Sequence, residues 1–246
     1  MNFFHKCILL RAKIPSLLRA LLPSLWFNFK YLPLRQAIRL PILVYKPHFL
    51  RLKGSVVIDS PCIHLGMIRL GFFTADVYPN AGITLRIEGK IIFQGRCFIG
   101  NDCYVICGKD GEIVFGNDFK ATGGIRLVSQ HGIHFGNHVL VGWGNTIIDT
   151  NFHPLYDMEK EHFKKAFGPI NIGENNWFAM NCLVMPGVTT PVHCIFAART
   201  IVTRGGQYES YCVHGGSPIG VLSRNVMRII GQDAIKDYTD KNYSFV

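Results

Sequence analysis

Mostly apolar residues recur every six positions in the last third of the chain. They are Ile172, Phe178, Val184, Thr190, Phe196, Val202 and Tyr208. Four positions after each comes a mostly small residue, in the order Asn176, Cys182, Val188, Cys194, Thr200, Gly206 and Cys212. A period of six sets successive residues about 240° apart around an α-helix, so one helix face cannot bury them. A triangular coil with three six-residue sides fits both columns, because large side chains fill its interior and small ones its tight corners.

Weaker copies of this pattern reach back to about residue 54. Phe115 and Phe135 are 20 residues apart, which is one 18-residue coil with two extra residues. Phe135 and Ile172 are 37 apart, which we interpret as one coil carrying a 19-residue excursion. The excursion spans 152–169 and is rich in charge, so it is expected to project as a loop. The pattern therefore predicts an all-β domain over 54–222, a left-handed parallel β-helix built as a hexapeptide solenoid.

The basic residues of the chain are concentrated before this domain. Ten Lys and Arg precede the first acid, Asp59, while the remaining 188 residues carry 16 basic and 16 acidic residues. In residues 1–53 the cations alternate with Leu and aromatic positions, and the stretches Ser16–Leu22 and Leu34–Leu43 are predicted to be short amphipathic helices. This composition suits peripheral contact of residues 1–50 with an anionic membrane. A cap on the end of the solenoid stays open as the alternative, whereas nucleic-acid binding is excluded because the body is neutral.

Other segments suggest where the protein resides. Charged residues interrupt the apolar runs near the N-terminus, so neither a membrane span nor a signal peptide is predicted. We expect a cytoplasmic protein, in peripheral contact with the inner membrane face.

The eight Cys form no tight framework, no CxxC pair and no zinc-like Cys/His spacing, which favours reduced thiols. Residues 223–246 lose the repeat, and their apolar and basic residues predict a short helical cap.

Three phrases near the end of the chain resemble the hexapeptide-repeat acetyltransferases. They are Ile172-Gly173-Glu174-Asn175-Asn176-Trp177, Met185-Pro186-Gly187-Val188-Thr189 and Gly215-Gly216-Ser217-Pro218-Ile219-Gly220. The pair His153-Pro154, placed before a looped-out segment, is similar to the galactoside, maltose and xenobiotic acetyltransferase branch. The stretch 148–153 looks most like the branch of capsule and lipopolysaccharide synthesis. The resemblance covers roughly 85–225 and specifies the fold and acyl transfer, but hardly the acceptor.

Acyl transfer from a thioester requires a base that removes the acceptor proton as the nucleophile attacks. Imidazole suits this step because it titrates near neutral pH. His153 is the candidate base, because it stands where the chain leaves the solenoid and because the resemblance points to it. Asp149 or a backbone carbonyl is expected to hold its tautomer. The alternative is a surface histidine at a loop entrance.

The resemblance also implies the remaining site residues. The oxyanion donors are backbone groups near Ala179 and Met180. Coenzyme A contacts are expected from Trp177, Ala197, Ala198, Arg199, Thr203, Arg204 and Arg224. Acceptor contacts are expected from Gly124, Ser129, Gln130, Trp143, Asn145 and Asp149. Two departures stand out: Ile219 or Gly220 replaces the usual basic residue of the closing phrase, and Gly124 stands where relatives carry Asn.

We therefore predict an enzyme that moves an acetyl group from acetyl-CoA to a hydroxyl, less favourably an amine, of a sugar. The resemblance implies surface-polysaccharide biosynthesis, a glycan-precursor acceptor and a homotrimer. One rival is a non-catalytic solenoid scaffold at the membrane. A second is a metal-dependent hydratase of the carbonic-anhydrase kind, for which His131, His134 and His138 lack the matching spacing, so no metal is expected.

Overall fold

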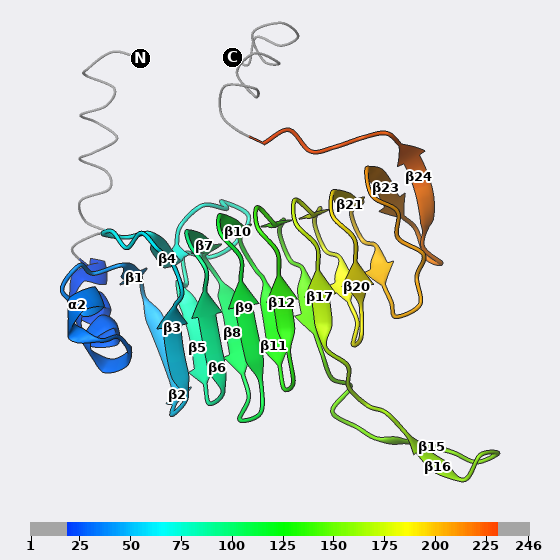
Figure 1. Cartoon of the computed structure of the whole chain (residues 1–246), viewed down its shortest axis with the longest axis horizontal. Coiled ribbons are helices and arrows are strands. Elements are labelled where there is room, and N and C mark those ends of the chain that lie inside the picture. Colours follow the sequence, from blue (N-terminus) through cyan, green and yellow to red (C-terminus); the bar gives the residue numbers. More distant parts are fainter. Residues whose placement is uncertain (1–18, 231–246) are drawn as a thin grey trace, which may run out of the picture.

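The computed structural model describes residues 19–230 and is a triangular solenoid with three sheets as its faces (Figure 1). From β1 (Ile42–Val44) to β22 (Ile201–Val202) the chain passes through faces A, B and C in turn. Strands of successive coils pair in parallel within each face. The predicted left-handed parallel β-helix is confirmed. We name its three edges by the faces they join: the AB, BC and CA corners.

The faces are built as follows. Face A is the nine-stranded sheet of β1 (Ile42–Val44), β4 (Ile68–Phe72), β7 (Cys97–Gly100), β10 (Phe119–Ala121), β13 (Leu140–Val141), β18 (Trp177–Phe178), β21 (Cys194–Phe196), β23 (Cys212–Gly215) and β24 (Gly220–Arg224). Face B contains β2 (Pro47–Leu52), β5 (Ile83–Ile87), β8 (Cys103–Cys107), β11 (Arg126–Ser129), β14 (Thr146–Ile148), β19 (Leu183–Val184) and β22 (Ile201–Val202). Face C contains β3 (Ser55–Ile58), β6 (Lys90–Phe93), β9 (Glu112–Phe115), β12 (Ile133–Phe135), β17 (Ile170–Ile172) and β20 (Thr189–Thr190).

The register of face C agrees with the spacing in the sequence. Phe115 pairs with Phe135, and Phe135 pairs with Ile172. The Phe115 and Phe135 rings stack with centroids 5.7 Å apart. The extra residues therefore leave the solenoid without shifting its buried column, as expected when each coil must place an apolar side chain above the last. The predicted excursion is a hairpin of β15 (Leu155–Asp157) and β16 (His162–Lys164), which projects from the BC corner (Figure 1).

Six of the seven small residues in the corner column are buried, three cysteines among them. Cys182, Cys194 and Cys212 are 3% exposed or less. The seven cysteines of the described chain are all free. Burial raises the pKa of the Cys194 thiol to about 12 and that of Cys103 to about 11. Such thiols stay protonated near neutral pH, so they fill space rather than act as nucleophiles.

The solenoid begins earlier than predicted, because β1 and β2 lie before residue 54 and pair in faces A and B. Ahead of them is a helix described over residues 19–31, which we call the N-terminal helix. It extends beyond the predicted stretch Ser16–Leu22, whose first three residues lie outside the described part. The second predicted helix, Leu34–Leu43, is much shorter: α2 spans Leu34–Ala37.

Two buried polar side chains explain why the N-terminal helix packs against β1. The Val44 N–H donates to the Ser24 hydroxyl at 2.8 Å. The Asn28 amide accepts from the Ile42 N–H at 3.2 Å and donates to the Ile42 carbonyl. Strand β1 has no preceding coil on this side, so its open backbone groups need such partners. The helix therefore closes the end of the solenoid, as the cap alternative anticipated.

The C-terminal expectation was wrong within the described residues. Where a helical cap was predicted from residue 223, β24 instead pairs antiparallel with β23, and residues 225–230 continue without helix. The open edge of β23 takes a strand because it offers a complete row of backbone partners. The rest of the predicted cap, 231–246, lies outside the described part. Among residues 19–230, none of the helices has the length and apolarity needed to cross a bilayer.

Candidate functional site

His153 lies at the root of the hairpin. Strand β14 of face B ends at Ile148. The two sides of the hairpin root are joined by the Asn151 N–H, which donates to the Ala166 carbonyl at 2.7 Å. A tight turn follows, in which Phe152 has φ of 59° and the His153 N–H donates to the Asn151 carbonyl at 2.7 Å. The His153 side chain is exposed. Within residues 19–230 no hydrogen-bond partner reaches its ring, so it faces outward from this chain.

Asp149 does not hold His153, contrary to expectation. Its side chain is fully buried and accepts hydrogen bonds from the backbone N–H groups of Gln130 (2.8 Å), His131 (2.8 Å) and Gly132 (2.7 Å). The Ser129 hydroxyl donates to the same carboxylate at 2.9 Å. These donors belong to the BC corner of the preceding coil. Asp149 therefore fixes the corner from which the hairpin departs, and it has no surface to offer an acceptor.

A shallow basic groove lies beside the hairpin root. It brings together hairpin residues and the next two BC corners, and its lining is Asn151, Lys165, Phe167, Met185, Pro186, Thr203 and Arg204. Arg204 donates to the Phe167 carbonyl at 3.4 Å, and the Lys165 ammonium lies 4.9 Å from the Phe167 ring centroid. Thr203 and Arg204 were predicted to meet phosphates. Lys165 and Phe167 were missed, although their place in the charged excursion marked them.

A second group of predicted residues lies at the AB corner. Ala179, Met180, Ala198, Arg199 and Trp143 stack there on successive coils. The Ala179 N–H donates to the Phe196 carbonyl at 2.9 Å, so it cannot serve an oxyanion. The Met180 N–H has no acceptor among residues 19–230, and its side chain is 47% exposed. Met180 is thus the donor that the geometry leaves available.

Two further residues predicted to contact coenzyme A lie elsewhere on the solenoid. Trp177 lies half-buried on face A, paired with Leu140 and Ile195. The Arg224 guanidinium lies 3.1 Å from the Glu209 carboxylate, which raises the pKa of the guanidinium. This predicted phosphate ligand is therefore already paired with a carboxylate.

Three predicted acceptor residues are structural. Ser129 and Asp149 bond to each other, and the fully buried Asn145 bonds to the Ala179 carbonyl at 2.7 Å and the Cys182 N–H at 3.0 Å. Gln130 is half-buried, Ala197 donates its N–H to the His214 carbonyl, and Trp143 is 40% exposed.

The two groups cannot meet within one chain. His153 and the groove are at the BC corner, whereas Met180 and Trp143 are at the AB corner. One full side of the triangle, six residues long, separates the corners. At ~3.3 Å per residue this side is roughly 20 Å long. A reaction that uses both His153 and Met180 therefore requires a second copy of the chain.

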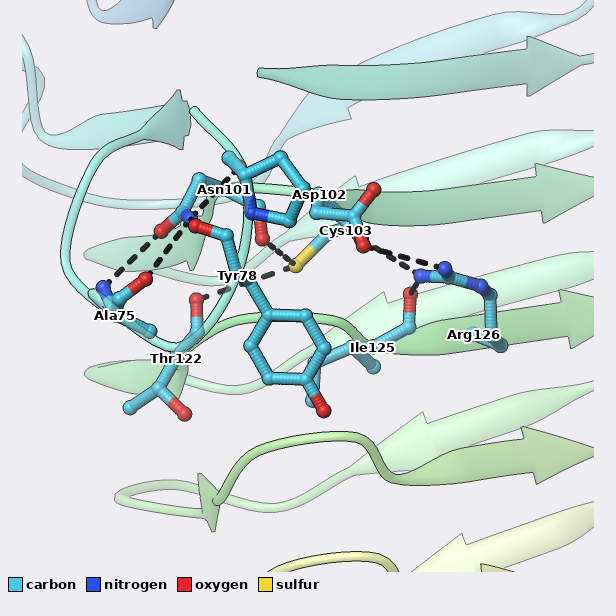
Figure 2. A network of polar contacts seen from close by, with 9 residues as sticks. Ala75, Tyr78, Asn101, Asp102, Cys103, Thr122, Ile125 and Arg126 are labelled. Carbon is cyan, nitrogen blue, oxygen red and sulfur yellow. Dashed lines mark hydrogen bonds and ion pairs between the residues drawn. The ribbon is translucent and has the colours of Figure 1, made fainter. Parts of the chain in front are cut away.

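The AB corner carries a loop that the sequence did not reveal. Residues 73–82 leave face A after β4 and fold over the next coils, and the buried Asn101 side chain holds them (Figure 2). Its oxygen accepts from the N–H groups of Thr74 (3.0 Å) and Ala75 (3.1 Å), and its amide donates to the Tyr78 carbonyl at 3.1 Å. The Tyr78 ring then lies directly over Gly124.

This ring gives a reason for glycine at position 124, where the resemblance led us to expect asparagine. Gly124 has φ of +69°, but Asp102 and Asn181 adopt similar values at equivalent places on other coils. The backbone alone therefore does not demand glycine. A Cβ on Gly124, however, would collide with the ring of Tyr78. Gly124 is thus covered by Tyr78 rather than open to an acceptor.

We predict that Gly124→Ala destabilises the protein by about 3 kcal/mol, from overpacking and the left-handed backbone together. In a Tyr78→Ala background the collision is gone, so only about 1 kcal/mol is expected. Urea unfolding of the four proteins measures this coupling. Equal losses in both backgrounds would show that Tyr78 is not the cause.

Each of the three histidines near the middle of the chain contacts a different side chain. His134 lies 3.1 Å from Glu112, and His138 lies 3.4 Å from Asp118. His131 stacks on Phe167 with ring centroids 3.7 Å apart. The part of the chain that the structure describes contains no group of three or more His, Cys, Asp and Glu side chains placed to hold a metal ion.

Comparison with known proteins gives the following similarities. The chain is 37% identical over 91 residues to the "Putative acetyltransferase" of Staphylococcus aureus (strain MRSA252), covering 37% of this chain and 44% of that protein. It is 33% identical over 113 residues to the galactoside O-acetyltransferase of Lactococcus lactis, covering 44% and 52%. The chain thus spans about half the length of these relatives. No protein-family model matches it.

Among solved structures, the polySia-specific acetyltransferase NeuO is similar with a TM-score of 0.46 and 15% identity, over 79% of this chain and 98% of that one. The sequence relatives include galactoside O-acetyltransferases, which is the branch that His153-Pro154 indicated. The observed solenoid is the fold that the three C-terminal phrases implied. The resemblance of this chain to the hexapeptide-repeat acetyltransferases is therefore confirmed.

Proposed function

We propose that the protein transfers an acetyl group from acetyl-CoA to a sugar hydroxyl, with His153 as general base. The observation that carries this proposal is the exposed imidazole at the hairpin root, beside a groove with two cations. In the proposed reaction, a ring nitrogen of His153 takes the hydroxyl proton as the oxygen attacks the thioester carbonyl. When the tetrahedral intermediate collapses, the C–S bond breaks and the sulfur recovers that proton.

The groove at the BC corner is the proposed place for the anionic part of the donor. Arg204 and Lys165 are both exposed, and their cations suit the phosphates of coenzyme A. Thr203 adds a hydroxyl. Arg224, engaged by Glu209, is removed from this set. The basic residue missing from the closing phrase is thus replaced by cations from the hairpin and from residue 204.

The proposed site is completed by a second copy. The oxyanion donor Met180 is one side of the triangle away from His153, so Met180 of the partner subunit supplies the N–H. A contact of this kind joins unlike corners, which makes it heterologous. Repeated around an axis it closes into a ring, and three triangular solenoids close it with three equal contacts. We therefore propose a homotrimer.

The proposed acceptor is a sugar of a surface polysaccharide or its precursor, with a hydroxyl favoured over an amine. Trp143 supports a carbohydrate, because its half-exposed ring at the AB corner offers a stacking face. The galactoside O-acetyltransferases among the relatives agree with a hydroxyl. With Ser129, Asn145 and Asp149 buried, the hairpin and the AB corner of the partner subunit are left to shape the pocket.

Two measurements on the purified full chain test the proposal. Calorimetry is expected to show saturable coenzyme A binding, weakened by Arg204→Gln but not by Lys109→Gln, which removes an exposed cation at the BC corner two coils before the hairpin. Labelled acetyl-CoA with a panel of free and polymeric sugars is expected to yield a labelled ester. The absence of binding at millimolar coenzyme A would favour a non-catalytic scaffold. Sedimentation equilibrium tests the trimer.

A further inference from the structure

The end of the solenoid closed by the N-terminal helix presents an apolar face to the surroundings. Because Ser24 and Asn28 are locked onto β1, the opposite side of this helix points outward. We define the N-terminal face by the large apolar side chains exposed there. They are Leu21, Leu22, Trp26 and Phe29 of the helix, with Leu34 and Ile38 of α2 and its end. Leu22 is 76% exposed and Phe29 is 52% exposed.

Such a face is unusual for a surface in water. Single exposed apolar residues are common, but here six large ones are gathered on two consecutive helical segments. The same helix has the buried side that the solenoid needs: Phe27 is 1% exposed and stacks on Phe49. Among the six exposed residues, Trp26 also packs on Phe49 with ring centroids 5.3 Å apart, so it serves both the cap and the exposed face.

The charges around this face all have one sign. Arg19, Lys30, Arg35 and Arg39 are exposed on the same two segments. Within residues 19–230 none of these four cations forms an ion pair with a carboxylate. Residues 1–58 contain ten Lys and Arg and no Asp or Glu. Lys30 lies 5.5 Å from the Trp26 ring centroid, so a cation and an aromatic ring stand side by side.

We infer that the N-terminal face lies on an anionic lipid bilayer. Apolar side chains enter the boundary between headgroups and acyl chains, while the surrounding cations meet anionic headgroups. Leu22, Trp26 and Phe29 are spaced to share one helix face, as an interfacial helix requires. The inference is independent of the proposed acetyl transfer, since it concerns the other end of the molecule.

Two other occupants suit this face less well. A second copy that packed face to face would bring its own Arg and Lys side chains against these four cations. Residues 1–18 bring Lys6, Arg11 and Lys13 and no acid, so they also lack complementary charge. A bilayer rich in anionic lipid offers both the apolar interior and the opposite charge.

The test uses the full chain and vesicles of phosphatidylglycerol and phosphatidylcholine. We expect co-sedimentation with the mixed vesicles, weaker binding as salt rises, and little binding to pure phosphatidylcholine. The double variant Leu22→Ser, Phe29→Ser should lower the partition coefficient by about a hundredfold, or about tenfold for each side chain. Arg19→Gln with Arg35→Gln should lower it by about thirtyfold. Leu222→Ser, which alters an exposed leucine on β24, is the matched control and should bind normally.

A second readout measures insertion directly and leaves every residue of the N-terminal face in place. With Trp143→Phe and Trp177→Phe, Trp26 is the only tryptophan left. Its fluorescence should shift to the blue and be quenched by brominated lipids when mixed vesicles are added. Each of three outcomes would overturn the inference: equal binding to neutral vesicles, unchanged binding by the Leu22→Ser, Phe29→Ser variant, or self-association without lipid that this variant abolishes.

Discussion

Replacement of His153 by alanine is expected to lower acetyl transfer by ~10²–10⁴-fold, the usual contribution of a positioned base. The side chain is exposed and has no hydrogen-bond partner among residues 19–230, so its loss should leave the stability unchanged. The measurement is labelled acetyl transfer at saturating acetyl-CoA, with thermal unfolding of the same preparation. Coenzyme A binding should persist, because the groove cations remain in place.

The matched control is His162→Ala, which removes another exposed histidine from the same hairpin. If His153 acts as the base, this control should keep near-normal turnover. A rate for His153→Ala within a few fold of wild type would refute the mechanism. A rate lost equally in both variants would instead mean that the hairpin, and not the imidazole, matters.

Replacement of Asp149 by alanine should destabilise the protein by about 3–5 kcal/mol. The substitution leaves the three N–H groups of Gln130, His131 and Gly132 without their buried acceptor. Each unsatisfied buried donor costs about 1–3 kcal/mol, and partial entry of water reduces the sum. Urea unfolding measures the loss. Amide hydrogen exchange should accelerate at these three residues before the rest of the solenoid opens.

Asp110→Ala is the control, because Asp110 is exposed at the same corner two coils earlier. It should change the free energy of unfolding by no more than about 0.5 kcal/mol. A similarly small effect of Asp149→Ala would contradict the role given to this carboxylate. Alanine keeps the backbone carbonyl of Asp149 that accepts from the Gly168 N–H at 3.0 Å, so any loss of acetyl transfer should follow from displacement of the corner at residues 130–132.

The sequence was sufficient to predict the repeating coils, because the burial of a side chain depends on its position within its own coil. Every coil must place an apolar side chain inside and a small one at the corner, so the six-residue period and the register of Phe115, Phe135 and Ile172 could be read directly. The excursion could be located for the same reason. A stretch that breaks the period cannot remain in the sheets, and it left the solenoid after Ile148.

The two ends of the solenoid were not predictable in this way. Strands β1 and β24 lie where a coil is missing on one side, and their surroundings come from Asn28 and from β23. Neither end carries the clear repeat, so the first strands were assigned to the N-terminal extension and the last strand to a helix. What covers an open edge depends on contacts between segments, and a periodic pattern says nothing of them.

By itself, then, the sequence determined the fold class and the register, since both depend on repeat position, while the resemblance to a known family singled out His153 as the candidate base. Only the tertiary structure decided which polar residues are buried. Asp149 and Asn145 find their partners on neighbouring coils, 17 to 37 residues away. It also placed His153 and Met180 at different corners. Which corner of the triangle a residue occupies depends on how each coil closes in three dimensions. Because these two residues occupy different corners, the proposed site requires two copies of the chain.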